Sequence, residues 1–316
     1  MHFSKNILIP AMKKSGTTSL WLLKMILPIS LVVRLLDYFG LLAFMASFLD
    51  PLFVYLGLPG STAIVFLTSI FLPLYAPLAI ITSMSITLRE LTILALMCQI
   101  AHNLPVESAI QGKTGTTFRS MTILRILMGI VAGFLLNQLL PKEMGMPLFT
   151  QTNIVAISSI GELLVVWLKS SLNIALLIAA IVFTLNLLYN ILNYHNLIAK
   201  LSKGLNPVLK IFGLPENTGF LLLIGYIVGL AYGGALMMDQ MKDGQVSRTD
   251  ANLLNHHLAL SHSVIEDNLL FVALGVSIWW ILGVRLTLAW IVVWVRIFFL
   301  KLQSGKLRFS FKSNDI

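Results

Sequence analysis

Residues 49–60 read LDPLFVYLGLPG, and residues 205–216 read LNPVLKIFGLPE. The two stretches share a proline and a Gly-Leu-Pro turn at an offset of 156 residues. Farther along the chain the offset becomes 160, and it relates the pairs His102 and His262, Glu107 and Asp267, Gly115 and Gly275, Arg125 and Arg285. One offset that relates a histidine, an acid, a glycine and an arginine indicates that the chain contains two copies of one unit.

The composition places both copies in a lipid bilayer. Of the 316 residues, 57% are apolar and 11% are charged, and the mean hydropathy is +0.89. Soluble domains carry about 25% charged residues. The 22 Lys and Arg residues exceed the 13 Asp and Glu residues mainly at the termini and in a few loops. This distribution is typical of membrane topology, so we expect lipid as a partner and no nucleic acid.

Each half contains four apolar segments, here called segments a to d, and a linker joins the halves. In the two halves these segments are a (20–48 and 171–197), b (61–84 and 218–239), c (89–112 and 251–275) and d (119–140 and 282–302). The predicted organisation is a cytoplasmic leader (1–19), a first repeat (20–140), a linker (141–170), a second repeat (171–302) and a basic cytoplasmic tail (303–316).

Positive charges distinguish the two repeats. The loop between segments a and b has no Lys or Arg at 49–60, whereas its counterpart contains Lys200, Lys203 and Lys210. Lys and Arg mark the cytoplasmic side of a membrane, so equivalent loops are expected on opposite sides. The predicted fold class is therefore an all-α polytopic membrane protein with two inverted-topology repeats.

An inverted repeat needs an odd number of crossings, so each half is expected to have about three crossings plus a re-entrant helical hairpin. Segment b is the preferred hairpin, because its middle reads FLPLYAP at 71–77 and GYIVGLAYGGA at 225–235. Proline and glycine break helices at such positions. Segment c is the alternative. With segment b as the hairpin, we expect a multi-pass protein of the cytoplasmic (inner) membrane with both termini in the cytoplasm.

Segment c concentrates polar residues, and it reads CQIAHNLPVES at 98–108 and LSHSVIEDNLL at 260–270. Ionisable groups at membrane depth are costly and therefore suggest function. Histidine beside a carboxylate can hold a proton near neutral pH. In the second copy, His262 and Glu266 are four residues apart and are expected to share one helix face. The candidate substrate- or proton-binding residues are His102, Asn103, Glu107, His262, Ser263, Glu266 and Asp267. A purely structural role, in which each His–acid pair joins two helices, is the alternative.

Arg125 and Arg285 complete the candidate site. A guanidinium stays charged and suits a carboxylate or phosphate, so two inward arginines would neutralise an anionic substrate. Because both residues lie near the start of segment d, extension of their side chains to the membrane interface is an equal alternative.

The first hypothesis, a site for substrate or protons, predicts no metal and no cofactor. A metal site is the second hypothesis for these residues. Its ligands would be Cys98, His102, His262 and Glu266, because thiolate, imidazole and carboxylate together bind transition metals. A packed core cysteine is the preferred interpretation of Cys98.

The two GLP turns, the Gly-rich segments b and the segments c, HNLPVESAI and HSVIEDNLL, resemble the Gate, or nucleoside-recognition, domain family across roughly residues 20–300. Related domains occur in concentrative nucleoside transporters, ferrous-iron transporter B, spore maturation proteins and a dipicolinate exporter. The resemblance implies a transport-type core whose substrate varies among relatives.

The expected function is a secondary transporter or permease for a small polar solute, with anionic and nucleoside-like solutes included, bound where the repeats meet near the midplane. A divalent-metal permease and a non-transporting membrane assembly protein are the alternatives. We find no catalytic constellation and expect no enzyme. The expected partners are lipid, a small-molecule substrate and, for lack of a scaffold domain, a second copy of the chain.

Overall fold

The computed structural model describes residues 7–82, 84–148, 159–195 and 197–303. These ranges contain helices and no strand. The elements of the first half are α1 (Ile9–Tyr38), α2 (Leu41–Tyr55), the 3-10 helix η2 (Gly60–Thr62), α3 (Ala63–Phe71), α4 (Tyr75–Ile81), α5 (Leu88–Ala101), α6 (Leu104–Lys113) and α7 (Phe118–Leu139). Those of the second half are α8 (Ile160–Tyr194), α9 (Leu197–Gly204), α10 (Asn206–Ile211), the 3-10 helix η3 (Glu216–Thr218), α11 (Gly219–Ile227), α12 (Leu230–Lys242), α13 (Arg248–Ser261), α14 (Val264–Val272) and α15 (Ile278–Gln303).

The same local geometry recurs at paired positions of the two halves. Gly57 and Gly213 begin their Gly-Leu-Pro turns with φ of 71° and 68°, a backbone conformation that favours glycine. A capping box begins segment c in each half: Thr87 pairs with Glu90 at α5, and Ser247 pairs with Asp250 at α13. The paired residues therefore form the same turn and the same helix cap in each half, which explains why their residue types match.

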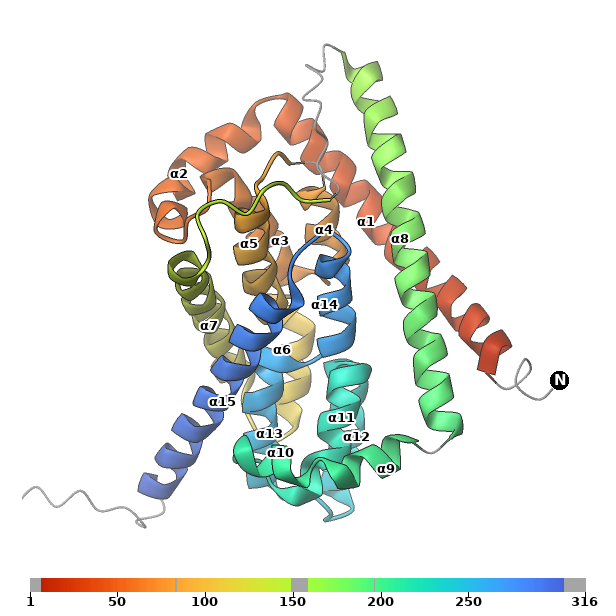
Figure 1. The fold of residues 1–316 in the computed structure, drawn as a ribbon, viewed down its shortest axis with the longest axis vertical. Coiled ribbons are helices and arrows are strands. Elements are labelled where there is room, and N and C mark those ends of the chain that lie inside the picture. Colours follow the sequence, from red (N-terminus) through yellow and green to blue (C-terminus); the bar gives the residue numbers. More distant parts are fainter. Residues whose placement is uncertain (1–6, 83, 149–158, 196, 304–316) are drawn as a thin grey trace, which may run out of the picture.

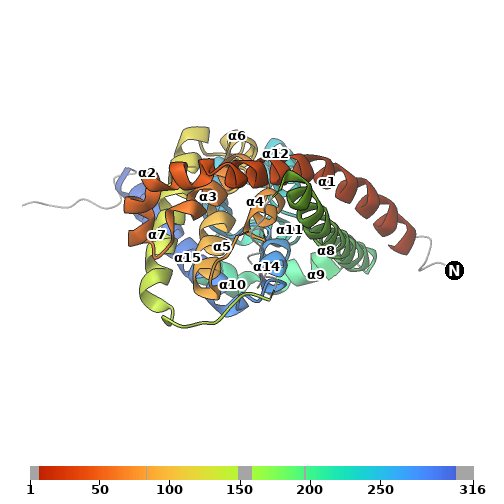
Figure 2. The same cartoon turned by 90° about the horizontal axis from the view of Figure 1, so that it is seen from above.

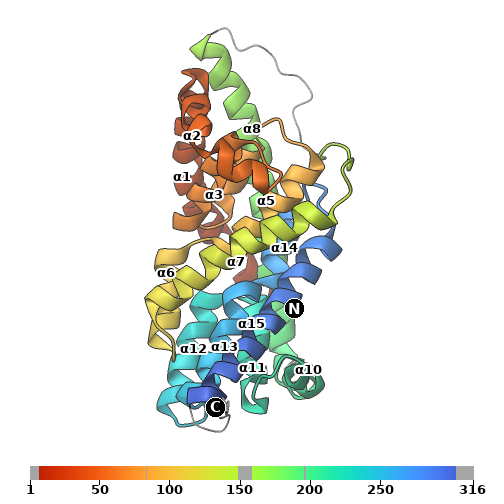
Figure 3. The same ribbon diagram turned by 90° about the vertical axis from the view of Figure 1, so that its left-hand side faces the viewer.

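Segments c and d of both halves form the centre of the bundle. Helix α5 packs on α7, and the equivalent α13 packs on α15. Between the halves, α13 contacts α7 and α15 contacts α5, so the same helix contact occurs twice. Figure 3 shows α7 and α15 crossing the bundle obliquely, one beside the other. The polar side chains of segment c thus lie on helices at the contact between the halves.

Helices α1 and α8 pack against each other and project from one side of the bundle (Figures 1 and 2). Figure 1 also shows the chain direction: α1 runs upward from the N-terminus and α8 runs downward. Helix α7 ends in the upper part of the bundle, whereas its equivalent α15 ends in the lower part (Figure 1). Equivalent long helices therefore run in opposite directions.

Segment b is broken where the sequence predicts. In the first half α3 ends at Phe71 and α4 begins at Tyr75, on either side of Pro73. In the second half the break is at Val228 and Gly229. A Cβ added to Gly233 of α12 would lie 3.4 Å from the Cα of Gly225 of α11. Eight residues of continuous helix would separate these residues by about 12 Å, so α11 and α12 form a helical hairpin.

The first segments begin earlier than the sequence suggests. Helix α1 starts at Ile9, within the predicted leader 1–19. Helix α8 starts at Ile160, within the predicted linker 141–170. Part of the linker (149–158) and most of the predicted tail (303–316) lie outside the described residues. Both helices extend past their apolar runs, since helix formation does not require every residue to face lipid.

Three described helices, α7, α8 and α15, are long and apolar enough to cross a membrane. The bent pair of α5 and α6 gives a fourth span if it is counted as one crossing. Helix α1 has comparable length but carries four cationic residues, Lys13, Lys14, Lys24 and Arg34. Large apolar side chains are exposed along α7, α8 and α15. Such continuous apolar surface suits contact with lipid.

Asn255 of α13 joins the second half to the loop between α6 and α7. Its side-chain amide donates to the Thr114 hydroxyl at 2.9 Å and also to the Thr114 carbonyl. We expect Asn255→Leu to lower the free energy of unfolding by about 1–3 kcal/mol, because both Thr114 acceptors stay buried. The matched control is the exposed Asn217→Leu, for which we expect a change of about 0.5 kcal/mol. Thermal unfolding in detergent measures both variants, and equal effects would contradict a role for Asn255 between the halves.

Candidate functional site

Segment c breaks at the same point in each half, directly after its histidine. Asn103 (φ 49°) and Ser263 (φ 46°) are the non-glycine residues with positive φ among the described ranges. The N–H of Asn103 donates to the Ser69 carbonyl at 2.8 Å, and the N–H of Ser263 donates to the Gly225 carbonyl at 2.8 Å. Each break is therefore held by a backbone hydrogen bond to the first helix of segment b.

The position of the breaks corrects one expectation. His262 ends α13 and Glu266 lies in α14, so the two residues do not share one helix face. In the first half the left-handed residue is Asn103, and Pro105 lies in the first turn of α6. The second half breaks at the same position without a proline. The left-handed residue after the histidine, and not Pro105, therefore accounts for both breaks.

The two histidines meet at the interface of the halves. Their Nε2 atoms are 3.2 Å apart, although the residues are 160 positions apart in sequence. The Glu107 carboxylate faces both rings: Oε2 lies 3.1 Å from His262 Nε2 and Oε1 lies 3.4 Å from His102 Nε2. All three side chains are buried. We call His102, Glu107 and His262 the central triad.

Backbone carbonyls fix the tautomer of both rings. His102 Nδ1 lies 3.0 Å from the Gln99 carbonyl oxygen, and His262 Nδ1 lies 2.8 Å from that of Leu258. A carbonyl only accepts, so each Nδ1 carries a proton, and a neutral ring then has a bare lone pair on Nε2. The two lone pairs face each other and the carboxylate, so the triad needs a cation among its atoms.

Arg125 and Arg285 make equivalent contacts behind the triad. Arg125 donates to the carbonyls of Ile100 and His102 and to Glu107 Oε2, the last at 2.6 Å. Arg285 makes the same contacts in its own half, with Leu260, His262 and Asp267. The sequence separations of 25, 23 and 18 residues are identical in the two sets.

These contacts explain why the arginines are buried. A helix that ends at a break leaves carbonyls without N–H partners, and each guanidinium satisfies two of them. Both side chains are 0% exposed. Neither arginine side chain reaches the protein surface, and each already neutralises a carboxylate, Glu107 or Asp267. Their positive charge is therefore used within the protein.

Two residues outside the predicted set reach across to the second half. The Tyr75 hydroxyl of α4 donates to Glu266 Oε1 at 2.5 Å. The Gln99 amide donates to the Asp267 carbonyl at 3.0 Å and to Asn268 Oδ1 at 3.2 Å. The sequence feature that could have identified both residues is a polar side chain in the middle of an apolar segment.

The remaining predicted residues lie around the triad. Asn103 places its amide 3.5 Å from Glu107 Oε1. Cys98 is buried in the hydrophobic core, and the Glu266 carboxylate accepts a hydrogen bond from the Tyr75 hydroxyl. The group of close metal-binding side chains in the described chain consists of His102, Glu107 and His262, without Cys98 or Glu266. Glu107 is thus the acid that the metal hypothesis omitted.

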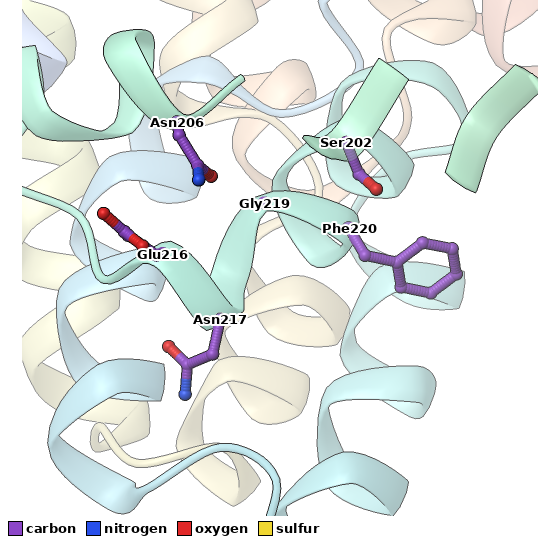
Figure 4. A pocket seen from close by; sticks show the side chains of 6 residues that line it. All are labelled: Ser202, Asn206, Glu216, Asn217, Gly219 and Phe220. Atoms are coloured by element: carbon purple, nitrogen blue, oxygen red, sulfur yellow. The ribbon is translucent and has the colours of Figure 1, made fainter. Parts of the chain in front are cut away.

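A surface hollow lies apart from the triad, where α9, α10, η3 and the start of α11 meet. It is lined by Ser202, Asn206, Glu216, Asn217, Gly219 and Phe220. Figure 4 shows the Phe220 side chain pointing away from those of Asn206 and Glu216. The hollow shares no residue with the triad.

Comparisons with known proteins agree with this description. The family model Gate, described as nucleoside recognition, matches residues 19–117. The chain is also 31% identical over 279 residues to the uncharacterized membrane protein YvoD of Bacillus subtilis (strain 168), covering 87% of this chain and 89% of the relative. This chain belongs to the Gate family. No solved structure matches it.

Membership in the Gate family confirms the resemblance drawn from the Gly-Leu-Pro turns and segments c. The matched part of this Gate protein ends at Thr117, so it includes His102 and Glu107 of the first half. Gate membrane proteins are transporter-like rather than enzymes. The second half supplies His262, so the complete triad needs both halves.

Proposed function

We propose that this Gate protein is a permease for a small polar solute, and that the central triad is its solute or coupling site. The observation that carries the proposal is the meeting of His102 and His262 at 3.2 Å, one from each half, at two equivalent helix breaks. Irregular backbone at membrane depth is tolerated where protein or a wet cavity surrounds it. A site shared by two halves changes its access when the halves move against each other.

We further propose that the halves are inverted-topology repeats with hairpin segments b. The opposite directions of α1 and α8, and of α7 and α15, support this arrangement (Figure 1). Lysines of the first c–d loop and the second a–b loop, Lys113, Lys200, Lys203 and Lys210, then lie in the cytoplasm with both termini. Reporter fusions at the C-terminus measure its side, and a non-cytoplasmic reporter would contradict this topology.

The arginine contacts bear on the charge of the solute. An anion at Arg125 or Arg285 would have to displace Glu107 or Asp267. Breaking a buried ion pair leaves an unpaired charge and is costly. A neutral or cationic solute therefore fits the centre better than an anionic one.

Flux into proteoliposomes tests the permease with a panel of nucleosides, small carboxylates and divalent metals. We expect uptake of one class, and we expect Glu107→Gln to reduce that uptake about tenfold to a hundredfold. The reason is that hydrogen bonds to charged groups contribute about 1.5–3 kcal/mol. The control is Glu216→Gln, which alters an exposed pair with Lys210 and should leave uptake unchanged. No uptake of any class by well-folded protein would favour the membrane assembly alternative.

A further inference from the structure

The shape of the central triad indicates what occupies it. A metal that binds two nitrogens at about 2.0–2.1 Å in tetrahedral geometry holds them about 3.3 Å apart. The two Nε2 atoms lie 3.2 Å apart, and each lies near one Glu107 oxygen: His262 Nε2 is 3.1 Å from Oε2 and His102 Nε2 is 3.4 Å from Oε1. The Nε2 atoms and the carboxylate oxygens therefore already lie at the spacing of ligands around one ion.

The surroundings of the triad match those of ligated histidines. Metal-binding histidines generally donate their other N–H to a carbonyl or carboxylate, which fixes the tautomer. Here both Nδ1 atoms face backbone carbonyls of α5 or α13. Arg125 holds Glu107 through Oε2 at 2.6 Å, whereas the contact of Oε1 with the Asn103 amide is long at 3.5 Å, so Oε1 is the oxygen more easily offered to an ion. Each ligand is thus oriented by a second contact.

A proton satisfies this centre less well than a metal ion. One proton bridges two atoms, whereas three groups with lone pairs, His102, His262 and Glu107, converge here. The arginines do not supply the positive charge, since each guanidinium is already paired with one carboxylate, Arg125 with Glu107 and Arg285 with Asp267. An ion with several coordination positions uses all three ligands at once.

We infer that His102, Glu107 and His262 bind one divalent first-row transition-metal ion, and that this ion is the solute of the permease. The second clause rests on the proposed function. Two imidazoles and one carboxylate suit zinc, iron, cobalt or nickel. Magnesium and calcium prefer ligands that are all oxygen, and no thiolate is available here for copper(I). Three protein ligands leave a fourth position open, as exchange of the ion requires.

Cobalt(II) absorption measures binding to the purified full-length protein in detergent. We expect one Co²⁺ per chain, displaced by Zn²⁺ and unaffected by excess Mg²⁺. His262→Gln and Glu107→Gln should each weaken binding about a hundredfold or more, since even second-shell partners contribute 10–100-fold. The control is His256→Gln, which removes a half-buried histidine of the same helix whose Nδ1 contacts the Asn252 carbonyl and should retain binding.

A second measurement needs no variant and so does not depend on variants that fold. X-ray absorption of the Zn²⁺-loaded wild type should show two imidazole ligands and at least one oxygen ligand. A wild type that binds no Co²⁺, or a zinc site without two imidazoles, would overturn the metal site. The permease would still stand if another solute enters proteoliposomes.

Flux of Zn²⁺ into proteoliposomes containing a fluorescent chelator tests the second clause. Uptake by the wild type and by His256→Gln, lost in His262→Gln, would support the ion as the solute. Stoichiometric binding with uptake of a different solute only would overturn that clause and leave the site. Binding without flux of any solute would overturn the proposed permease together with that clause.

Discussion

Replacing Arg285 by methionine is expected to lower the free energy of unfolding by about 3–5 kcal/mol, because removing one partner of a buried ion pair leaves the other charge uncompensated. Arg285 is fully buried and lies 2.8 Å from Asp267 Oδ2. The same substitution leaves the Leu260 and His262 carbonyls at the end of α13 without a donor. The ion pair and the two helix-end carbonyls all depend on this side chain.

Thermal unfolding in detergent measures the effect, and Lys242→Met is the matched control. Lys242 pairs with Asp239 on the surface at 3.8 Å, and such exposed pairs contribute about 0–1 kcal/mol. Adding Asp267→Asn to Arg285→Met should restore part of the lost stability, because the uncompensated carboxylate is then gone. A double variant that is less stable than Arg285→Met alone would contradict this explanation.

Sequence reasoning found the arginines but not their role. The two interpretations of Arg125 and Arg285 drawn from the sequence assigned their side chains a partner outside the protein, either a substrate anion or the membrane interface. The actual partners are carbonyls at two broken helix ends and one carboxylate each. Free carbonyls depend on where a helix stops, which side-chain patterns do not state.

The same limit explains which acid meets which histidine. The repeat offset paired His102 with His262 and predicted equivalent places for them, and the structure shows both at equivalent helix breaks. It did not predict that the rings touch or that Glu107 serves both. The left-handed residue Ser263 turns Glu266 away toward Tyr75. Spacing in sequence predicts neighbours only while the helix continues.

Breaks caused by special residues were predicted more securely. Pro73 and Gly229 mark the breaks of the two segments b, and the helices end on either side of them. Proline lacks a donor, and glycine adopts backbone angles closed to other residues, so both act locally. Local causes can be read from sequence, whereas contacts between the halves require the fold.

The break at Gly229 gives the second large expected effect. Its φ of 93° and ψ of −177° lie in a region that is essentially restricted to glycine. An added Cβ would also lie 2.5 Å from the Ser263 hydroxyl, beside the histidine of the central triad. We expect Gly229→Ala to lower the free energy of unfolding by about 2–5 kcal/mol, from backbone strain of about 1–3 kcal/mol and overpacking of similar size.

Gly283→Ala is the matched control for Gly229→Ala, because Gly283 lies within helix α15 with nothing within 4 Å of an added Cβ. There alanine should raise stability by about 0.5–1 kcal/mol.

Thermal unfolding gives both values, and cobalt(II) titration of the folded fraction gives the effect on the triad. Because Ser263 follows His262 directly, its displacement should also weaken Co²⁺ binding by about tenfold, the lower end expected for a supporting group. Wild-type stability in Gly229→Ala would mean that the tip of the α11–α12 hairpin does not lie against Ser263. Lost stability with full Co²⁺ affinity would separate the hairpin from the metal-binding geometry.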